Sequence, residues 1–255
     1  MIEKWDITIP ELTGGQVRSA YLYLPDSYWE DTNRRYPVLY MFDGHNVFFD
    51  QDATYGKSWG MGAYMDATKT QVMIAAVECN HSPDHGRLKE YAPFSFQDPS
   101  IGRITGQGKQ TMDWLVFTFK KEIDSHYRTL PDWKHTWIAG SSMGGLMSLY
   151  GLLQYNFVFS KAAALSPSLW TAASQIETMI QLSDVKPGTV LYMDYGQEEL
   201  RNRKLMLDSF RRTADRLLEK GILLNSRIVP GGTHCEASWE RQIPFFMNTL
   251  LYENG

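Results

Sequence analysis

A glycine-framed serine near the middle of the chain has the residue types of a nucleophile for acyl transfer. Residues 136–145 read Thr-Trp-Ile-Ala-Gly-Ser-Ser-Met-Gly-Gly, which places Ser142 at the centre of a Gly-x-Ser-x-Gly pattern. Gly140 and Gly144 allow a strand and a helix to approach closely while the serine is held in a strained turn that exposes its hydroxyl. A serine that only caps a helix is the alternative. Apolar residues at strand and helix spacing on the two sides favour the nucleophile elbow.

His234 is the candidate base for this serine. A hydroxyl is a weak nucleophile near neutral pH and needs a base within hydrogen-bond reach. Of the six histidines, only His234 follows Ser142 in the sequence, and two glycines before it let its loop fold back. An imidazole can both take and return a proton. The other five histidines are interpreted as loop or helix-end residues, with the exception of His45.

A carboxylate that orients the histidine should follow the strand predicted over residues 189–194. Asp194, Glu198 and Glu199 compete for this role. Asp194 still belongs to the strand, whereas Glu199 lies three residues beyond Gly196, on a loop from which a side chain can reach a histidine. We favour Glu199, which would fix the histidine tautomer and stabilise the imidazolium. Glu198 and Asp194 remain the alternatives.

Two backbone amides are the candidate donors for the oxyanion of a tetrahedral intermediate. One is the N–H of Met143, directly after the nucleophile, and the other should come from the loop after the strand predicted over residues 37–42. His45, which follows Asp43 and Gly44, is our choice for the second amide. A simple tight turn at these two residues is the alternative.

Alternating strands and helices are predicted to position these groups. A strand leads into Ser142, and further strand-like runs occupy residues 5–9, 17–24, 37–42, 72–77, 161–166, 189–194 and 223–229. Helical spacing covers residues 110–127 and 203–220, and a terminal helix should break or kink at Pro244. The segment 80–109 has no clear period and predicts a long surface excursion near the site. The pattern favours an α/β fold with a mostly parallel central sheet of about eight strands, an antiparallel start and helices on both faces.

The composition is typical of one globular domain. The chain has 255 residues, of which 43% are hydrophobic, so we predict a single domain over residues 1–255. A formal net charge of −4, without a large lysine or arginine cluster, argues against nucleic acid as a partner. We expect no membrane association and a cytoplasmic location, because there is neither a membrane-length apolar run nor a signal-peptide pattern.

Metal and cofactor sites are not expected from the sequence. The two cysteines, Cys79 and Cys235, show no metal-ligand spacing relative to each other. We therefore predict neither a zinc site nor a disulfide framework. Acyl transfer through a serine needs no organic cofactor.

Four segments together resemble the esterase family of α/β-hydrolases that includes esterase D, feruloyl esterases and enterochelin esterases. These segments are residues 43–48, 87–93, 140–145 and 232–239, and the resemblance covers nearly the whole chain. It implies the α/β-hydrolase fold and serine-dependent ester hydrolysis, with Ser142 and His234 in the places predicted above. The family often has aspartate as the acid, in a Gly-x-x-Asp loop, where this chain has Gly196-Gln197-Glu198-Glu199.

The second of these segments contains Arg87, Glu90 and Tyr91, for which we derive no catalytic role. We interpret them as an ion-paired anchor for the long loop, with pocket lining as the alternative. Aromatic residues near the predicted site loops are candidates for lining the substrate pocket, and as a group they favour a hydrophobic or aromatic ester. They are Phe48, Trp59, Phe94, Phe96 and Trp170.

The sequence thus predicts a carboxylic ester hydrolase that acts on a small-molecule ester through an acyl-enzyme. An acyltransferase with the same triad is the nearest alternative in chemistry. A hydrolase fold that only binds ligands is the alternative of another class, and such proteins usually lose a member of the triad. No feature of the sequence indicates an oligomeric state.

Overall fold

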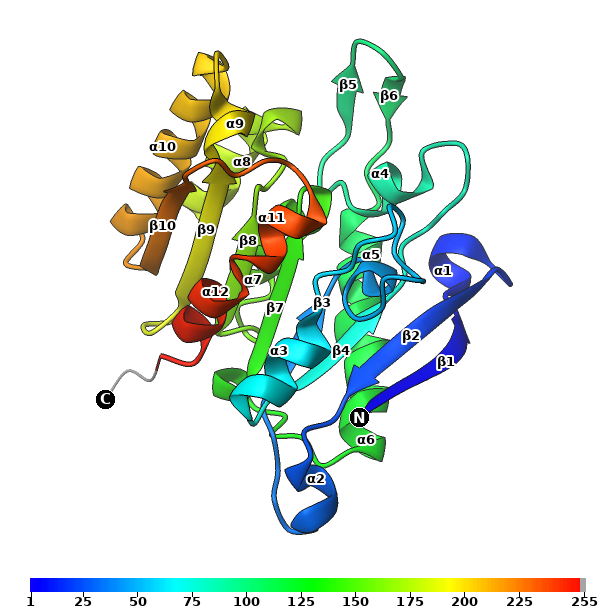
Figure 1. Ribbon diagram of the computed structural model, residues 1–255. Coiled ribbons are helices and arrows are strands. Elements are labelled where there is room, and N and C mark those ends of the chain that lie inside the picture. The colour runs from blue at the N-terminus through cyan, green and yellow to red at the C-terminus, as the bar shows by residue number, and fades with distance from the viewer. Residues whose placement is uncertain (253–255) are drawn as a thin grey trace.

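An eight-stranded sheet forms the centre of the computed structural model, which describes residues 1–252 (Figure 1). Its strands, in spatial order, are β1 (Ile2–Thr8), β2 (Val17–Tyr23), β4 (Met73–Val77), β3 (Val38–Met41), β7 (Thr136–Ser141), β8 (Lys161–Leu165), β9 (Val190–Gly196) and β10 (Leu223–Val229). β1 and β4 both pair with β2 in antiparallel fashion, and the other neighbours are parallel. The predicted sheet and its antiparallel start are confirmed. The last three residues of the predicted domain, 253–255, lie outside the described residues.

The central strands are continuous apolar runs because helices cover the sheet on both sides. One face packs against α5 (Gly108–Trp114), α6 (Lys120–His126), α7 (Met143–Gln154), α8 (Ala173–Leu182) and α10 (Lys204–Glu219). The other face packs against α3 (Met61–Thr68), α11 (Glu236–Glu240) and α12 (Ile243–Leu250). None of the helices in the described part of the chain has the length and apolar character needed to cross a membrane.

The segment 80–109 is more ordered than its sequence indicates. It contains the short helix α4 (Gly86–Glu90) and a hairpin of β5 (Phe96–Asp98) and β6 (Gly102–Ile104), which stands off the end of the sheet in Figure 1. Each of these elements is too short to show a period in the sequence. Further short helices are α1 (Pro10–Thr13), α2 (Ser27–Glu30) and α9 (Gln197–Leu200), with 3-10 turns at Gly44–Asn46, Trp133–His135 and Leu169–Thr171.

Two helical predictions are refined by the structure. The helix predicted over residues 110–127 runs from α5 to α6 through a π-helical turn, Leu115–Phe119. The predicted break in the terminal helix is confirmed, since α11 ends at Glu240 and α12 begins at Ile243. Pro244 lies in the first turn of α12, where a missing N–H costs no hydrogen bond. No helix was predicted from the sequence over the residues of α8.

Candidate active site

Ser142 occupies a strained turn between β7 and α7. Its backbone angles are φ 57° and ψ −120°, a conformation that side-chain-bearing residues rarely adopt. A Cβ on Gly140 would lie 2.7 Å from the carbonyl carbon of Gly144, and one on Gly145 would lie 2.8 Å from the carbonyl oxygen of Leu165. Gly140 and Gly145 are therefore required because the start of α7 touches the backbone of both β7 and β8.

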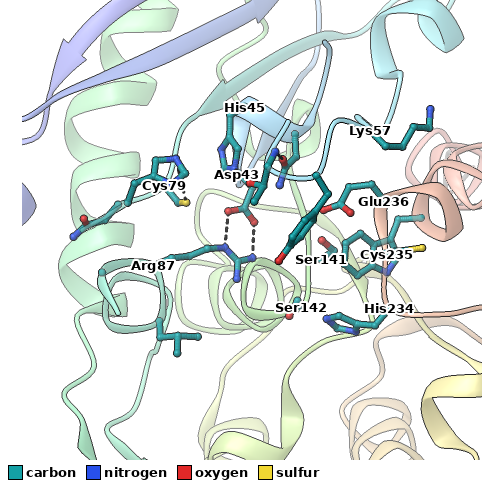
Figure 2. A pocket seen from close by; sticks show the side chains of 18 of the residues that line it. Asp43, His45, Lys57, Cys79, Arg87, Ser141, Ser142, His234, Cys235 and Glu236 are labelled. Atoms are coloured by element: carbon teal, nitrogen blue, oxygen red, sulfur yellow. Dashed lines mark hydrogen bonds and ion pairs between the residues drawn. The ribbon is translucent and has the colours of Figure 1, made fainter. Parts of the chain in front are cut away.

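The carboxyl ends of neighbouring strands bring a carboxylate and a histidine to the same edge as Ser142. Glu199 follows β9 and His234 follows β10, and Nδ1 of His234 lies 2.6 Å from Oε2 of Glu199. Ser142 and His234 line one cavity, shown in Figure 2. The Ser142 hydroxyl lies 3.4 Å from the Ser168 hydroxyl. The structure thus brings together the three residues that the sequence singled out, and it turns the serine towards Ser168.

Glu199 is held by contacts at both carboxylate oxygens. Its Oε1 accepts the N–H of Gly196 at 2.9 Å and the hydroxyl of Ser166 at 2.6 Å, while Oε2 faces His234. Burial acts to raise the pKa of Glu199, but the hydrogen bonds from His234 and Ser166 outweigh it and hold that pKa below its usual value. The carboxylate is therefore charged, and it is oriented to hold a proton on Nδ1 of His234.

The two competing carboxylates have other partners. Glu198 is exposed and pairs with Arg201 at 3.2 Å. Asp194 is 1% exposed, and it accepts hydrogen bonds from the Tyr192 hydroxyl at 2.8 Å and the Ser166 N–H at 3.2 Å. Of these three acids, Glu199 is the one that contacts His234, so it has the geometry of an orienting acid.

The buried carboxyl of Asp194 should make the free energy of unfolding depend on pH. Burial raises its pKa from 3.8 to about 7. A carboxyl whose pKa is raised by folding favours the folded state while protonated, so this contribution is complete below about pH 4 and is lost as the pH rises to 7. An asparagine side chain at this position could accept the Ser166 N–H and donate to Tyr192 without ionising. We expect the free energy of unfolding of Asp194→Asn, relative to wild type, to rise by about 1.4 kcal/mol per pH unit across this range.

Urea unfolding at about pH 5, 6 and 7, the range in which this carboxyl ionises, would measure the slope. Glu198→Gln is the matched control, because it removes an exposed carboxyl close to Asp194 in the sequence. Parallel pH profiles for wild type and Asp194→Asn would show that Asp194 is ionised throughout the range.

The amides of Met143 and His45 lie at the starts of two helical segments on neighbouring strands. Met143 is the first residue of α7, and a first-turn N–H has no acceptor within its own helix. His45 lies in the 3-10 turn after β3. A Cβ on Gly44 would lie 2.8 Å from the backbone of Val77, so this turn is pressed against the end of β4. Both amides are therefore carried by backbone at the carboxyl edge of the sheet, and His45 and Ser142 line the same cavity.

The turn that carries His45 is held in place through Asp43, the residue that directly precedes it. Arg87 donates from Nε to Oδ1 and from Nη2 to Oδ2 of Asp43, both at 2.7 Å, and Figure 2 shows this paired contact. The Asp43 N–H donates to the Tyr91 hydroxyl at 3.2 Å, and Glu90 forms a buried ion pair with Arg18 at 2.7 Å. The ion-paired anchor predicted for Arg87, Glu90 and Tyr91 is confirmed. Arg87 also lines the cavity, so the pocket-lining alternative holds for that residue.

Removing Arg87 should destabilise the protein strongly. Burial acts to raise the pKa of Asp43, and the Arg87 guanidinium outweighs it, so the pKa of Asp43 lies below its usual value. Arg87→Met would leave a buried, unpaired carboxylate, and we expect a loss of about 3 kcal/mol in the free energy of unfolding. Urea denaturation would measure it, with Arg201→Met, which breaks an exposed ion pair, as the control.

A second variant separates the charge from the packing of Arg87. Adding Asp43→Asn to Arg87→Met removes the unpaired charge and should recover part of the lost stability. Equal stability of Arg87→Met and Arg201→Met would contradict the anchoring role.

Two cavities meet at Ser142. The first has a volume of about 700 Å³ and the second about 520 Å³, and they share Arg87, Leu88, Ser142 and His234. The first is rich in polar side chains and is lined by His45, Lys57, Asn80, His81, His85 and Glu236, among others. The second carries larger apolar side chains, including Met143, Trp170, Tyr195 and Met206. The site therefore offers a polar side and a more apolar side to the two halves of a substrate.

Most of the aromatic residues predicted to line the pocket lie elsewhere. Trp170 lines the second cavity, and Phe96 packs edge-on against it with ring centroids 5.9 Å apart. Phe48 and Trp59 are buried in the core between the sheet and α3, α11 and α12. Phe94 packs against Tyr150 and lines a separate surface cavity. The predictions for Phe48 and Trp59 were wrong because large apolar side chains are more stable in the core than at a polar cavity. The prediction for Phe94 was wrong because this side chain lies at a different cavity.

Ser166 is a site residue that the sequence did not single out. It follows β8 with a φ of 43°, donates its hydroxyl to Glu199 and accepts the indole N–H of Trp239 at 3.1 Å. The sequence feature that could have identified Ser166 as a site residue is its position at the carboxyl end of a central strand.

Comparisons with known proteins agree with this geometry. A family model described as "Putative esterase" matches residues 13–245. The uncharacterized protein YbbA of Bacillus subtilis (strain 168) is 29% identical over an alignment of 249 residues, and the match covers 93% of this chain and 93% of that one. The chain belongs to this esterase family, and its class is that of the carboxylic ester hydrolases.

Solved structures share the fold. An IroE-like serine hydrolase from Shewanella oneidensis superposes with a TM-score of 0.76 at 20% identity, over 98% of this chain and 79% of that one. The CE1 ferulic acid esterase AmCE1/Fae1A of Anaeromyces mucronatus, solved in complex with ferulic acid, gives a TM-score of 0.66 at 17% identity, over 98% and 90% of the chains. At these identities the similarity shows a shared fold and nothing finer. That fold is the α/β-hydrolase fold predicted from the sequence.

Proposed function

We propose that Ser142, His234 and Glu199 form a catalytic triad that hydrolyses a carboxylic ester through an acyl-enzyme. The observation that carries the proposal is the 2.6 Å contact between His234 and Glu199 beside a serine in a strained elbow. Ser142 Oγ attacks the ester carbonyl and gives its proton to Nε2 of His234, and the amides of Met143 and His45 stabilise the oxyanion. The C–O bond of the ester then breaks, and the alcohol leaves with that proton. Water repeats the sequence on the acyl-enzyme and releases the acid.

The orientation of the Ser142 hydroxyl differs from the one that the proposed reaction requires. The Ser142 hydroxyl faces Ser168 at 3.4 Å, a long and weak contact. The proposed reaction requires this hydroxyl to turn from Ser168 to His234, which lines the same cavities as Ser142. Catalytic hydrogen bonds are commonly long without substrate and shorten when it binds.

The two cavities indicate the kind of ester. We infer that the substrate joins an apolar or aromatic part to a polar part that bears hydroxyl or charged groups. The apolar part would lie along Trp170, Tyr195 and Met206 in the second cavity. The polar part would lie among the histidine and asparagine side chains of the first cavity. A ferulic acid complex of a protein with the same fold makes hydroxycinnamate esters a natural first set of substrates.

Trp170 should contribute to binding the apolar part. It is 51% exposed and backed by Phe96 of the β5–β6 hairpin. An aromatic contact of this kind is worth about 1 kcal/mol, so Trp170→Ala should raise KM for methyl ferulate about fivefold and leave KM for an acetate ester within about twofold. Steady-state kinetics would measure both. Trp29→Ala, at another exposed tryptophan outside both cavities, is the control, and an equal rise in KM for both esters would contradict a role in acyl selection.

Trapping the acyl-enzyme tests the proposed mechanism. Wild-type protein mixed with p-nitrophenyl acetate should release a burst of about one p-nitrophenol per chain when deacylation is slower than acylation. Acid quenching followed by peptide mass spectrometry should place the acetyl group on Ser142. An acetyl group found only on another side chain, or turnover without any labelling by a serine-directed fluorophosphonate, would overturn the proposal.

A further inference from the structure

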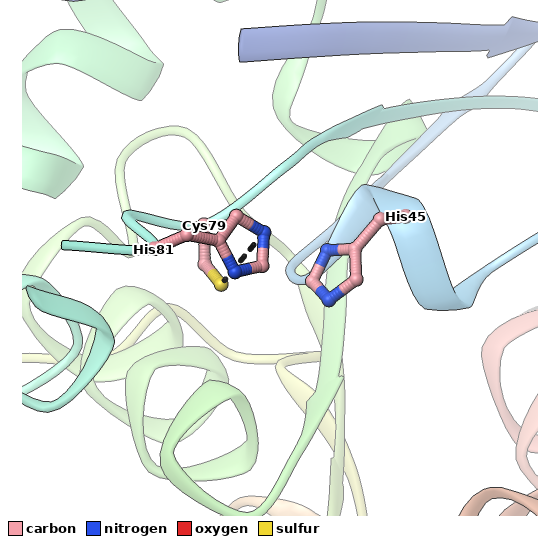
Figure 3. A group of neighbouring side chains, drawn as sticks. All are labelled: His45, Cys79 and His81. Carbon is pink, nitrogen blue, oxygen red and sulfur yellow. Dashed lines mark hydrogen bonds between the residues drawn. The ribbon is translucent and has the colours of Figure 1, made fainter. Parts of the chain in front are cut away.

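His45, Cys79 and His81 form a cluster of metal-ligating side chains outside the proposed triad. One ligand atom from each lies within 4.8 Å of the other two, and Figure 3 shows the two imidazoles and the thiol turned towards one another. His45 comes from the turn after β3, and the other two come from the segment after the neighbouring strand β4. The cluster therefore lies at the carboxyl edge of the sheet, and all three residues line the first cavity.

His45 has a buried nitrogen that nothing in the described residues satisfies. The residue is 4% exposed, and its Nε2 lies 3.0 Å from the Thr54 hydroxyl. Nδ1 has no hydrogen-bond partner within residues 1–252. An unsatisfied buried polar atom is costly and calls for a specific explanation such as an ion. The His45 ring meets the His81 ring edge to face, with centroids 4.8 Å apart, which directs this histidine into the cluster.

We propose that His45, Cys79 and His81 bind one Zn²⁺ ion. Two imidazoles and a thiolate are ligands that Zn²⁺ prefers, and a site with three protein ligands keeps a fourth position open. With Zn–N of about 2.0 Å and Zn–S of about 2.3 Å, ligand atoms around the ion lie about 3.5 Å apart. The ligand atoms of the cluster lie within 4.8 Å of one another, so the longest separation would shorten by about an ångström and the 3.9 Å between Cys79 Sγ and His81 Nε2 by less. Cys79 is free and buried, and its thiol gives up its proton to solvent when the metal–sulfur bond forms.

The surrounding charges fit a dication. Glu78 Oε1 lies 3.0 Å from Nε2 of His81, and Glu78 Oε2 accepts the Ser19 N–H at 2.9 Å, which fixes the carboxylate at the edge of the cluster. The Cys79 thiolate and the Glu78 carboxylate together balance the two positive charges of Zn²⁺. Arg87, a cation that lines the same cavity, is already neutralised by its paired contact with Asp43.

Zinc at this site would also affect turnover, a consequence that rests on the proposed function. The side chain of His45 would be a ligand, while its backbone N–H is the proposed oxyanion donor. The ion would also occupy part of the cavity that Ser142 lines. We therefore infer that Zn²⁺ bound by the cluster lowers the rate of ester hydrolysis.

Cobalt spectroscopy of the metal-free protein tests binding without reference to catalysis. Co²⁺ takes the place of Zn²⁺, and a thiolate ligand gives a charge-transfer absorption in the near ultraviolet. We expect this absorption to saturate at one Co²⁺ per chain, to disappear on addition of Zn²⁺ and to be absent in Cys79→Ser. Loss of an outer-shell partner of a metal ligand costs about 10- to 100-fold in affinity, so His81→Ala, which removes a ligand itself, should weaken Co²⁺ binding about 100-fold or more.

Cys235→Ser is the matched control, because Cys235 is the other free cysteine and lies beside His234 in the same cavity. It should leave the cobalt spectrum unchanged. The exposed side chain of His81 makes His81→Ala a safe variant for folding, should Cys79→Ser prove unstable. No thiolate band in wild type, or a band lost in Cys235→Ser and kept in Cys79→Ser, would overturn the site.

The effect on turnover is measured separately. Zn²⁺ should inhibit hydrolysis of p-nitrophenyl acetate by wild type over the concentration range in which it displaces Co²⁺. His81→Ala should require about 100-fold more Zn²⁺ for the same inhibition. Equal inhibition of both proteins would contradict the coupling and place the inhibitory ion outside the cluster. Failure of the esterase proposal would appear as missing acylation of Ser142, with the cobalt spectrum unaffected.

Discussion

Replacing Ser142 with alanine should lower kcat/KM for p-nitrophenyl acetate by about 10⁵-fold or more. The serine forms the covalent bond, so His234 and the oxyanion donors cannot replace its contribution, and single removal of a triad nucleophile has costs of this size. The variant should fold normally, since alanine at the same backbone angles loses only the long contact with Ser168. Steady-state and burst kinetics would both register the loss.

Ser168→Ala is the matched control for this result. Ser168 carries the hydroxyl that contacts Ser142, so comparing the two variants would reveal a nucleophile wrongly assigned between them. We expect Ser168→Ala to retain the acyl burst. Comparable turnover by wild type and Ser142→Ala would remove the serine from the mechanism. Loss of turnover only in Ser168→Ala would move the nucleophile to Ser168.

Replacing Glu199 with glutamine should lower kcat by about 10⁴-fold with little change in KM. A glutamine side chain at this position could still accept from Gly196 and Ser166 through its carbonyl oxygen, as Glu199 Oε1 does. Its NH₂ group would then face Nδ1 of His234, which would have to accept, so the proton would sit on Nε2 and that nitrogen could no longer act as a base. Loss of the carboxylate also removes the partner of the imidazolium.

Glu198→Gln provides the comparison, because it makes the same chemical change one residue earlier on an exposed side chain. Its kcat should stay within about twofold of wild type, since an exposed side chain without a contact to His234 takes no part in the proton transfer. Nitrogen NMR of labelled histidine adds a readout that a merely structural change would not move, since Glu199→Gln should shift the His234 tautomer. A large loss in Glu198→Gln with near-normal kcat in Glu199→Gln would exchange the roles of the two residues.

The sheet was predictable because its central strands are unbroken apolar runs that end in glycine-rich or polar turns. Residues 37–42 and 72–77 show this pattern and became β3 and β4 within one residue at each end. The β5–β6 hairpin was not predictable, since three-residue strands have no measurable period. Its packing of Phe96 against Trp170 depends on contacts between segments that lie far apart in the sequence.

The proposed site was predictable where chemistry is encoded locally. Ser142 is framed by glycines, and His234 and Glu199 each follow a recognisable strand. The contact between His234 and Glu199 follows because β9 and β10 are neighbours. The cluster of His45, Cys79 and His81 shows the opposite case. His45 lies far from the other two in the sequence, and it meets them only because β3 and β4 are adjacent in the sheet.

Glu199 contributes to both the folding and the proposed chemistry of this edge of the sheet. Through Oε1 it closes the first turn of α9 by accepting the Gly196 N–H, and through Oε2 it orients His234. An aspartate at this position would be one methylene shorter and could not span both partners from the same backbone. Any lineage that exchanges these two acids must therefore reshape residues 196–200 at the same time, so the exchange is a coupled change of loop and side chain.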